Sequence, residues 1–139
     1  MSRSPKEKGV ITESKVLNEL LKHGFDVSQP FGDNSRYDFV VDNGELYRVQ
    51  VKTAHSRDNG TVKFNTASRR PKRDGSSAID DYDGDVDAFC VYCPDYNDVW
   101  WIDVQDTAKD TMVLRIEPTA NGQTKGINWA EDYKLEKAI

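Results

Sequence analysis

Two alternating stretches, residues 36–42 and 45–53, lie on either side of Asn43 and Gly44 and constrain the fold more than any other feature of the chain. Both read as β-strands, because apolar and polar residues alternate and an Asn-Gly pair is typical of a hairpin turn. The length of the turn matters, since a register shift of one residue sends every side chain of a strand to the opposite face of the sheet.

A two-residue turn would put the apolar residues of the two strands on different faces. A three-residue turn over residues 42–44 instead pairs Val41 with Glu45. It also places Asp38 opposite Arg48. Because burial of a single face decides between registers, the three-residue turn is predicted. The predicted apolar face holds Tyr37, Phe39, Val41, Tyr47, Val49 and Val51, and the predicted polar face holds Asp38, Arg48, Gln50 and Lys52.

The N-terminal segment predicts a helix over residues 5–23. Ser4, Pro5 and Glu7 match the N-cap, first and third positions of a helix start. Gly24 supplies the stop signal at the other end. The apolar residues at helical spacing are Val10, Val16, Leu17, Leu20 and Leu21.

Glu13 falls inside this apolar stripe, between Leu20 and Leu17 when positions are turned by about 100° per residue. A carboxylate in a buried stripe has to be paired, protonated or bound to a cation, because burying it alone is costly. Glu13 is therefore a candidate cation ligand. The alternative is a glutamate at the edge of the stripe that reaches solvent or a buried arginine.

Further strands are predicted in four segments, 61–66, 86–93, 99–104 and 112–116. Residues 67–85, rich in Arg, Lys, Asp, Gly and Ser, are predicted to form a long surface loop. The tail from Asn128 is expected to form a short helix. Because neither an internal repeat nor a domain boundary is visible, residues 1–139 are expected to form a single domain.

Cys90 and Cys93 have the C-x-x-C spacing of some zinc and redox sites. They lie, however, in a segment that reads as a buried strand, where residues three apart point to opposite faces. The preferred interpretation is therefore that both cysteines are structural.

The net charge of −5 argues at first against a partner as anionic as DNA. One cluster nevertheless concentrates positive charge, and it consists of Arg69, Arg70, Lys72 and Arg73. This cluster is either a phosphate-contacting patch or a solvated loop. Since no segment is typical of a secretory signal or a membrane span, a cytoplasmic protein with no membrane partner is expected.

A carboxylate on the first helix, an aspartate on the following strand and a Gln-x-Lys on the next occur in the order Glu13, Asp38, Gln50 and Lys52. The order and spacing of these four residues resemble the motif of the PD-(D/E)XK nuclease superfamily, and the resemblance covers about residues 5–104. The resemblance is strongest to homing endonucleases associated with group I introns and to archaeal Holliday junction resolvases. It implies an α/β, restriction-endonuclease-like core, in which a central mixed β-sheet is flanked by α-helices.

The resemblance also implies a metal-dependent DNA endonuclease that hydrolyses phosphodiester bonds. Asp38 would be the central ligand of Mg²⁺, with Gln50 and Glu13 as further ligands and the backbone carbonyl of Val51 completing the set. Mn²⁺ is expected to substitute for Mg²⁺. Lys52 would orient or deprotonate the attacking water, or stabilise the charge of the transition state.

The chain departs from the superfamily motif in two places, because Gln50 replaces an acidic residue and no proline precedes Asp38. A neutral amide offers one acceptor oxygen and no charge, so it should weaken metal binding. The homing-endonuclease branch accepts glutamine here, and an active enzyme is therefore expected. The alternatives are a Holliday junction resolvase and a catalytically silent DNA-binding or assembly protein on the same fold.

DNA contacts are expected from six basic residues, Arg57, Lys63, Arg69, Arg70, Lys72 and Arg73. A chain this small offers one cleft, so cutting both strands of a duplex requires two copies. A homodimer or homotetramer is therefore expected.

Overall fold

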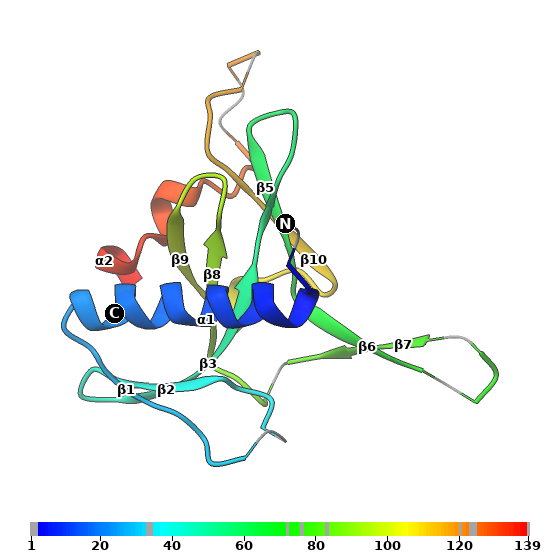
Figure 1. Cartoon of the computed structure of the whole chain (residues 1–139). Coiled ribbons are helices and arrows are strands. Elements are labelled where there is room, and N and C mark those ends of the chain that lie inside the picture. Colours follow the sequence, from blue (N-terminus) through cyan, green and yellow to red (C-terminus); the bar gives the residue numbers. More distant parts are fainter. Residues whose placement is uncertain are drawn as a thin grey trace.

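The computed structural model describes residues 3–32, 35–71, 73–75, 77–82, 84–119, 121–122 and 125–138. Its centre is a five-stranded sheet in the order β1-β2-β3-β8-β9, in which β3 and β8 are parallel and the other neighbours antiparallel (Figure 1). The strands are β1 Asp26–Ser28, β2 Phe39–Asp42, β3 Leu46–Thr53, β8 Ala88–Cys93 and β9 Asp98–Asp103. The central mixed sheet expected from the sequence is confirmed.

Helix α1 (Pro5–Lys22) crosses one face of this sheet and forms where the capping signals predict it. The hydroxyl of Ser4 accepts a hydrogen bond from the backbone N–H of Glu7 at 3.2 Å. At the other end Gly24 has a φ of 87°, a left-handed conformation that glycine adopts without steric cost. The predicted helix is thus confirmed to within one residue.

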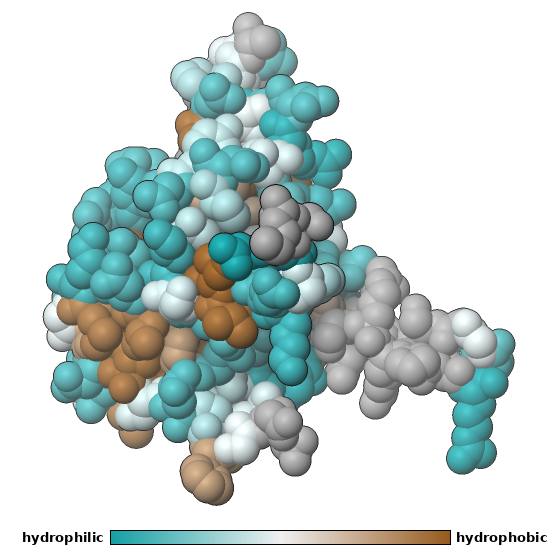
Figure 2. Space-filling model, in the orientation of Figure 1, coloured by the Kyte–Doolittle hydropathy of each residue, from teal (hydrophilic) through white to brown (hydrophobic). Residues whose placement is uncertain are grey.

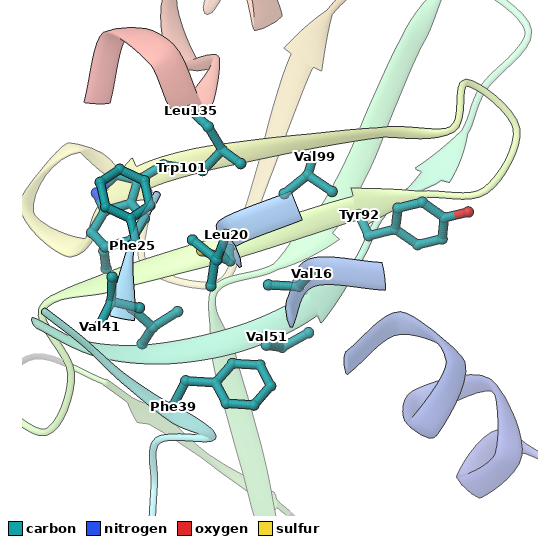
Figure 3. Packing of buried hydrophobic residues seen from close by; sticks show 13 residues of the cluster. Val16, Leu20, Phe25, Phe39, Val41, Val51, Tyr92, Val99, Trp101 and Leu135 are labelled. Atoms are coloured by element: carbon teal, nitrogen blue, oxygen red, sulfur yellow. The ribbon is translucent and has the colours of Figure 1, made fainter. Parts of the chain in front are cut away.

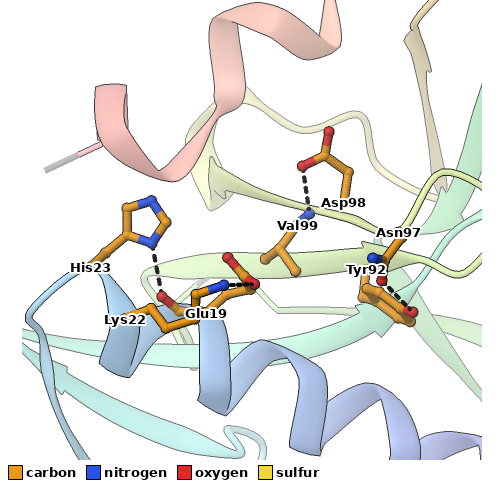
Figure 4. Close-up of polar contacts among 7 residues, drawn as sticks. All are labelled: Glu19, Lys22, His23, Tyr92, Asn97, Asp98 and Val99. Atoms are coloured by element: carbon orange, nitrogen blue, oxygen red, sulfur yellow. Dashed lines mark hydrogen bonds and ion pairs between the residues drawn. The ribbon is translucent and has the colours of Figure 1, made fainter.

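Polar contacts stabilise the C-terminal end of α1 and the turn between β8 and β9 (Figure 4). The Nδ1 atom of His23 lies 2.8 Å from the backbone oxygen of Glu19, and the amine of Lys22 lies 3.3 Å from the Glu19 carboxylate. In the turn, the hydroxyl of Tyr92 donates to the side-chain oxygen of Asn97 at 3.2 Å. Asn97 has a φ of 50°, which asparagine tolerates better than most residues.

The buried face of α1 differs from the predicted stripe. Its buried residues are Thr12, Val16 and Leu20. Val10 and Leu21, which the stripe included, are 59% and 53% exposed. Because the buried positions are four residues apart, they form one face that is rotated away from Val10 and Leu21. Glu13 lies half-buried at the edge of this face.

The buried side chains between α1 and the sheet form the first core (Figure 3). Its members are Val16, Leu20, Phe25, Phe39, Val41, Val49, Val51, Ala88, Cys90, Tyr92, Val99, Trp101 and Leu135. The predicted apolar face of β2 and β3 therefore lies under α1. The exception is Tyr37, which packs against the core on the other side of the sheet.

The turn between β2 and β3 has the predicted three-residue length, but it lies one residue later, at residues 43–45. Val41 pairs with Tyr47, so the predicted partner Glu45 is wrong by two positions. The Asp42 carboxylate accepts a hydrogen bond from the backbone N–H of Gly44 at 2.9 Å. This Asx-turn bond lets the backbone of Asp42 remain in β2. The facing of β2 and β3 is unchanged, because a shift of two residues preserves the alternation.

The other face of the sheet is covered by a small antiparallel sheet in the order β10-β5-β4 and by the short helix η2. These elements and their neighbours are β4 His55–Ser56, β5 Thr61–Asn65, η1 Val104–Asp106, β10 Thr111–Arg115, η2 Ala130–Tyr133 and α2 Leu135–Ala138. Their buried side chains, together with those of the sheet face beneath them, form the second core. Cys90 lies in the first core and Cys93 in the second, and both thiols are free, as the structural interpretation predicts.

Residues 67–85 do not form the predicted loop. Strands β6 (Ala67–Pro71) and β7 (Ser77–Asp81) pair as an antiparallel hairpin, with Arg69 opposite Ile79. This hairpin, the basic hairpin, projects away from the body of the molecule (Figure 1). Apolar and polar residues do not alternate in the sequence of this hairpin, so hydrophobic periodicity could not predict its strands.

Most of the molecular surface on the side of α1 is hydrophilic, and hydrophobic residues are exposed there in a few places (Figure 2). Among the described residues, no helix combines the length and the apolar character needed to cross a lipid bilayer.

Two adjacent leucines of α1 test the observed burial. Leu20 is fully buried and Leu21 is 53% exposed. We expect Leu20→Ala to lower the free energy of unfolding by about 2–5 kcal/mol, because it leaves a cavity in the first core. Leu21→Ala, the matched control, should change it by less than about 0.5 kcal/mol. Urea denaturation measures both, and equal losses would contradict the observed rotation of the helix.

Candidate active site

Asp38 lies where the pairing of β2 with β3 ends. Its backbone N–H donates to the carbonyl of Val49 at 2.8 Å. Its carboxylate accepts from the backbone N–H of Val51, also at 2.8 Å. In a longer strand, the N–H of Val51 would donate to a backbone carbonyl of β2. Because β2 begins only at Phe39, the Asp38 carboxylate accepts this hydrogen bond instead. The side chain of Asp38 is therefore anchored to the backbone of β3.

Glu13 of α1 and Asp38 line the same cleft, where a protonated Glu13 forms a hydrogen bond with the Asp38 carboxylate. Burial, this hydrogen bond and the charge of Asp38 raise the pKa of Glu13 to about 7. Two carboxyl groups in contact resist double ionisation unless a cation compensates their charge. Glu13 and Asp38, called the carboxylate pair below, thus offer hard oxygen ligands and a local excess of negative charge, which suit a divalent cation.

A cleft of about 350 Å³ adjoins the carboxylate pair. Its other walls come from the segment that leads from β1 to β2, namely Gln29, Pro30, Gly32, Ser35 and Tyr37. The carboxyl groups are therefore accessible from outside the fold.

Gln50 and Lys52 lie on the face of β3 opposite α1, as predicted. In the parallel pairing they stand next to Phe89 and Val91, both of the second core. The amine of Lys52 donates to the hydroxyl of Tyr82 at 3.1 Å. Among the described residues, no salt bridge joins Lys52 to the carboxylate pair.

The predicted common face of Asp38, Gln50 and Lys52 is therefore only partly present. Because the alternation of β2 breaks at Asp38, its carboxylate lies at the end of the strand and meets Glu13 from the α1 side. The predicted pairing of Asp38 with Arg48 is wrong, because Arg48 pairs with Val40 and the backbone N–H of Asp38 donates to the carbonyl of Val49. The structure thus brings Glu13, Asp38 and the backbone of Val51 together, with Gln50 next in the chain.

Residues 3–136 match the family model described as PD-(D/E)XK endonuclease. The chain belongs to the PD-(D/E)XK endonuclease family. A solved structure of a bacterial homing endonuclease, I-Ssp6803I, is similar to it, with a TM-score of 0.77 and 24% identity over 96% of this chain and 90% of that chain. At this identity the likeness shows the fold alone, which is the restriction-endonuclease-like α/β fold. No curated protein sequence matches the chain.

In the part of the chain that the structure describes, no third acidic, histidine or cysteine side chain joins the carboxylate pair in a group that could hold a metal ion. A cation at the pair would therefore take its further ligands from neutral oxygens. The candidates along β3 are the side-chain oxygen of Gln50, which stands where the family motif has an acidic residue, and the backbone carbonyl of Val51.

The basic residues singled out in the sequence occupy two places. Arg57 is exposed between β4 and β5, and it lines a groove of about 240 Å³ together with Lys63 of β5. Arg69 and Arg70 lie on β6, and Arg73 is exposed in the turn of the basic hairpin. Lys72 lies outside the described residues.

Tyr82 is a residue that the sequence did not single out. It follows β7 directly and is 6% exposed. The guanidinium of Arg36 lies over its ring, 4.0 Å from the ring centroid. Burial alone would raise the pKa of Tyr82, but its contacts with Lys52 and Arg36 outweigh burial and lower it. A tyrosine inside a charged, loop-like stretch carries no pattern that would have predicted these contacts.

The raised pKa of Glu13 predicts a pH-dependent loss of stability when divalent cations are chelated. The native state binds the Glu13 proton more tightly than the unfolded state, so stability falls as the pH rises from about 4.5 to about 7. Glu13→Gln should remove this fall. The difference from the wild type should be about 1 kcal/mol at pH 8, after allowing for solvent screening of a half-exposed group, and absent below pH 4.5.

Denaturant titrations at pH 4 and pH 8 in chelator measure this difference. Glu19→Gln on the same helix is the matched control and should leave the pH dependence as in the wild type. Identical pH dependence in the wild type and Glu13→Gln would show that the carboxyl groups do not interact.

Proposed function

We propose that this family member is a Mg²⁺-dependent DNA endonuclease with its active site at the carboxylate pair. The contact between Glu13 and Asp38 carries this proposal, because two carboxyl groups forced together beside an accessible cleft suit a bound cation. The motif order of the family and the anchoring of Asp38 to the N–H of Val51 support it.

In this proposal Glu13 and Asp38 would hold the ion through carboxylate oxygens, together with the side-chain oxygen of Gln50 and the carbonyl of Val51. A bound divalent ion supplies charge neutralisation at the scissile phosphate and a water that is nucleophilic near neutral pH. Asp38 keeps its orientation through its hydrogen bond to β3. Lys52 orients or deprotonates the attacking water, or stabilises the charge that develops on the phosphate.

Local clusters of basic residues support DNA as the substrate, although the chain as a whole is acidic. The net charge is −5, yet basic residues gather on the basic hairpin and beside the groove of Arg57 and Lys63. A hairpin that projects from the body can lie along a duplex while the body places its cleft at the backbone. We propose one nuclease domain per chain, and two or four copies for cutting both strands.

A homing-endonuclease-like activity is the favoured form of this proposal, because a structural neighbour is described as a bacterial homing endonuclease. Linear duplex and four-way junction substrates separate it from a resolvase. Selective cutting of the junction would favour a resolvase. Binding without cutting at any Mg²⁺ concentration would favour a silent binding module, with Gln50 as its weakened ligand.

Removing the anchored carboxylate should abolish cutting. We expect Asp38→Ala to lower the Mg²⁺-dependent cleavage rate at least about 100-fold, because the ion loses its central ligand. Lys52→Ala should lower it about 10²–10⁴-fold while DNA binding is retained. Asp26→Asn, an exposed carboxylate on β1, is the control and should cut normally. Unchanged cutting in Asp38→Ala would remove the proposed site.

Removing basic side chains from the hairpin should weaken DNA binding independently of sequence. For the double variant Arg69→Ala with Arg70→Ala, the slope of log K against log salt should fall by about two units, one for each lost phosphate contact. Lys137→Ala, an exposed lysine of α2, is the control and should leave the slope unchanged. Fluorescence anisotropy in chelator measures binding without cutting. An unchanged slope in the double variant would exclude the hairpin from the interface.

A further inference from the structure

The segment between β7 and β8 lies at the base of the basic hairpin, and it contacts β3 on the side of the second core. We call its described residues, 82 and 84–87, the base segment. Three cations from the β2–β3 region contact it, namely Arg36, Arg48 and Lys52. The base segment is therefore tied to the strands that carry the proposed active site.

Arg48 makes the firmest of these ties. Its backbone N–H donates to the Asp87 carboxylate at 2.7 Å, and its guanidinium contacts both oxygens of that carboxylate at 3.3 Å. The same guanidinium donates to the carbonyl of Gly84 at 3.1 Å. Arg36 adds an ion pair with Asp85 at 3.2 Å. These contacts fix the backbone that follows Tyr82.

The ring of Tyr82 is held independently of Lys52. It packs edge-on against Phe89 with ring centroids 5.4 Å apart, and the Arg36 guanidinium lies 4.0 Å from its centroid. Only 6% of the residue is exposed. A packed aromatic ring with a fixed backbone presents its hydroxyl at one place, which makes it a rigid support for a flexible partner.

That partner is Lys52. Its amine lies 3.1 Å from the hydroxyl of Tyr82 and 4.6 Å from the ring centroid, so the phenol contacts the amine with both its oxygen and its π-face. A lysine side chain has many rotamers, and holding its amine in one position needs a specific contact. A neutral phenol provides this contact without adding a negative charge that would compete for the lysine or for a cation.

We propose that Tyr82 is a positioning residue for Lys52, which it holds at one place through its hydroxyl. The proposal rests on the proposed function, in which Lys52 acts on the water or the phosphate. Tyr82 itself touches neither substrate nor ion. Its contribution is to raise the fraction of molecules in which the Lys52 amine is placed for reaction.

The test compares Tyr82→Phe with Tyr92→Phe under saturating Mg²⁺. Both tyrosines are 6% exposed and both hydroxyls are hydrogen-bonded, but Tyr92 bonds Asn97 in the β8–β9 turn. Tyr82→Phe keeps the ring, its packing against Phe89 and the Arg36 guanidinium at its ring, and removes the hydroxyl, which contacts Lys52 and also interacts with Arg36. We expect it to lower kcat about tenfold with unchanged KM, and to lower Tm no more than Tyr92→Phe, which also loses one hydrogen bond. Tyr92→Phe should leave kcat unchanged.

A double-mutant cycle on stability provides a second measurement that does not depend on cleavage. The effects of Tyr82→Phe and Lys52→Met on the free energy of unfolding should be non-additive, because either change removes the same contact. Additive effects would show that the hydroxyl does not hold the lysine and would overturn the proposal.

The kinetic outcomes also separate the two proposals. If the wild type cuts and Tyr82→Phe cuts equally well, the positioning role is overturned and the proposed function stands. A loss of kcat that is accompanied by a larger loss of Tm than in Tyr92→Phe, or that Tyr92→Phe shares, assigns Tyr82 a merely structural role and overturns the proposal. If the wild type does not cut with Mg²⁺, the proposed function fails, and with it this role of Tyr82.

Discussion

The packing of α1 on the apolar face of β2 and β3 is the constraint on which the rest of the structure depends. Val16 and Leu20 are fully buried against this face, and their burial fixes the rotation of the helix. Glu13, one turn before Leu17 and at the edge of the buried face, is thereby turned toward the end of β2. A helix rotated to bury Val10 and Leu21 would point this carboxyl elsewhere, and the contact with Asp38 would be lost.

In the proposed active site, the polar groups approach from two sides of the sheet. Glu13 comes from the α1 side, whereas Gln50 and Lys52 lie on the opposite side. Asp38 and the backbone of Val51 stand between them, at the point where β2 begins and the ladder ends. A strand end offers this access, since in the interior of the sheet the backbone of β2 would separate the two faces.

Much of the candidate site could be predicted from sequence because its residues lie in regular elements. Glu13 follows from the helical spacing of α1, and Gln50 and Lys52 follow from the alternation of β3. Tyr82 could not be predicted, because its contacts with Lys52 and Arg36 join segments that are 30 or more residues apart. Tyr37 was placed on the wrong face, since alternation continues only as long as the ladder does.

The sequence by itself determined the ends of α1, the facing of β2 and β3, and the order of the motif residues, because caps and period-two alternation are local signals. Only the tertiary structure decided the register of β2 on β3, since a shift of two residues leaves the alternation unchanged. It also decided the basic hairpin, because the sequence of its strands lacks an alternation of apolar and polar residues that would predict them. The meeting of Glu13 with Asp38 is likewise tertiary, because it needs α1 to be packed on the sheet before either carboxyl group can reach the other.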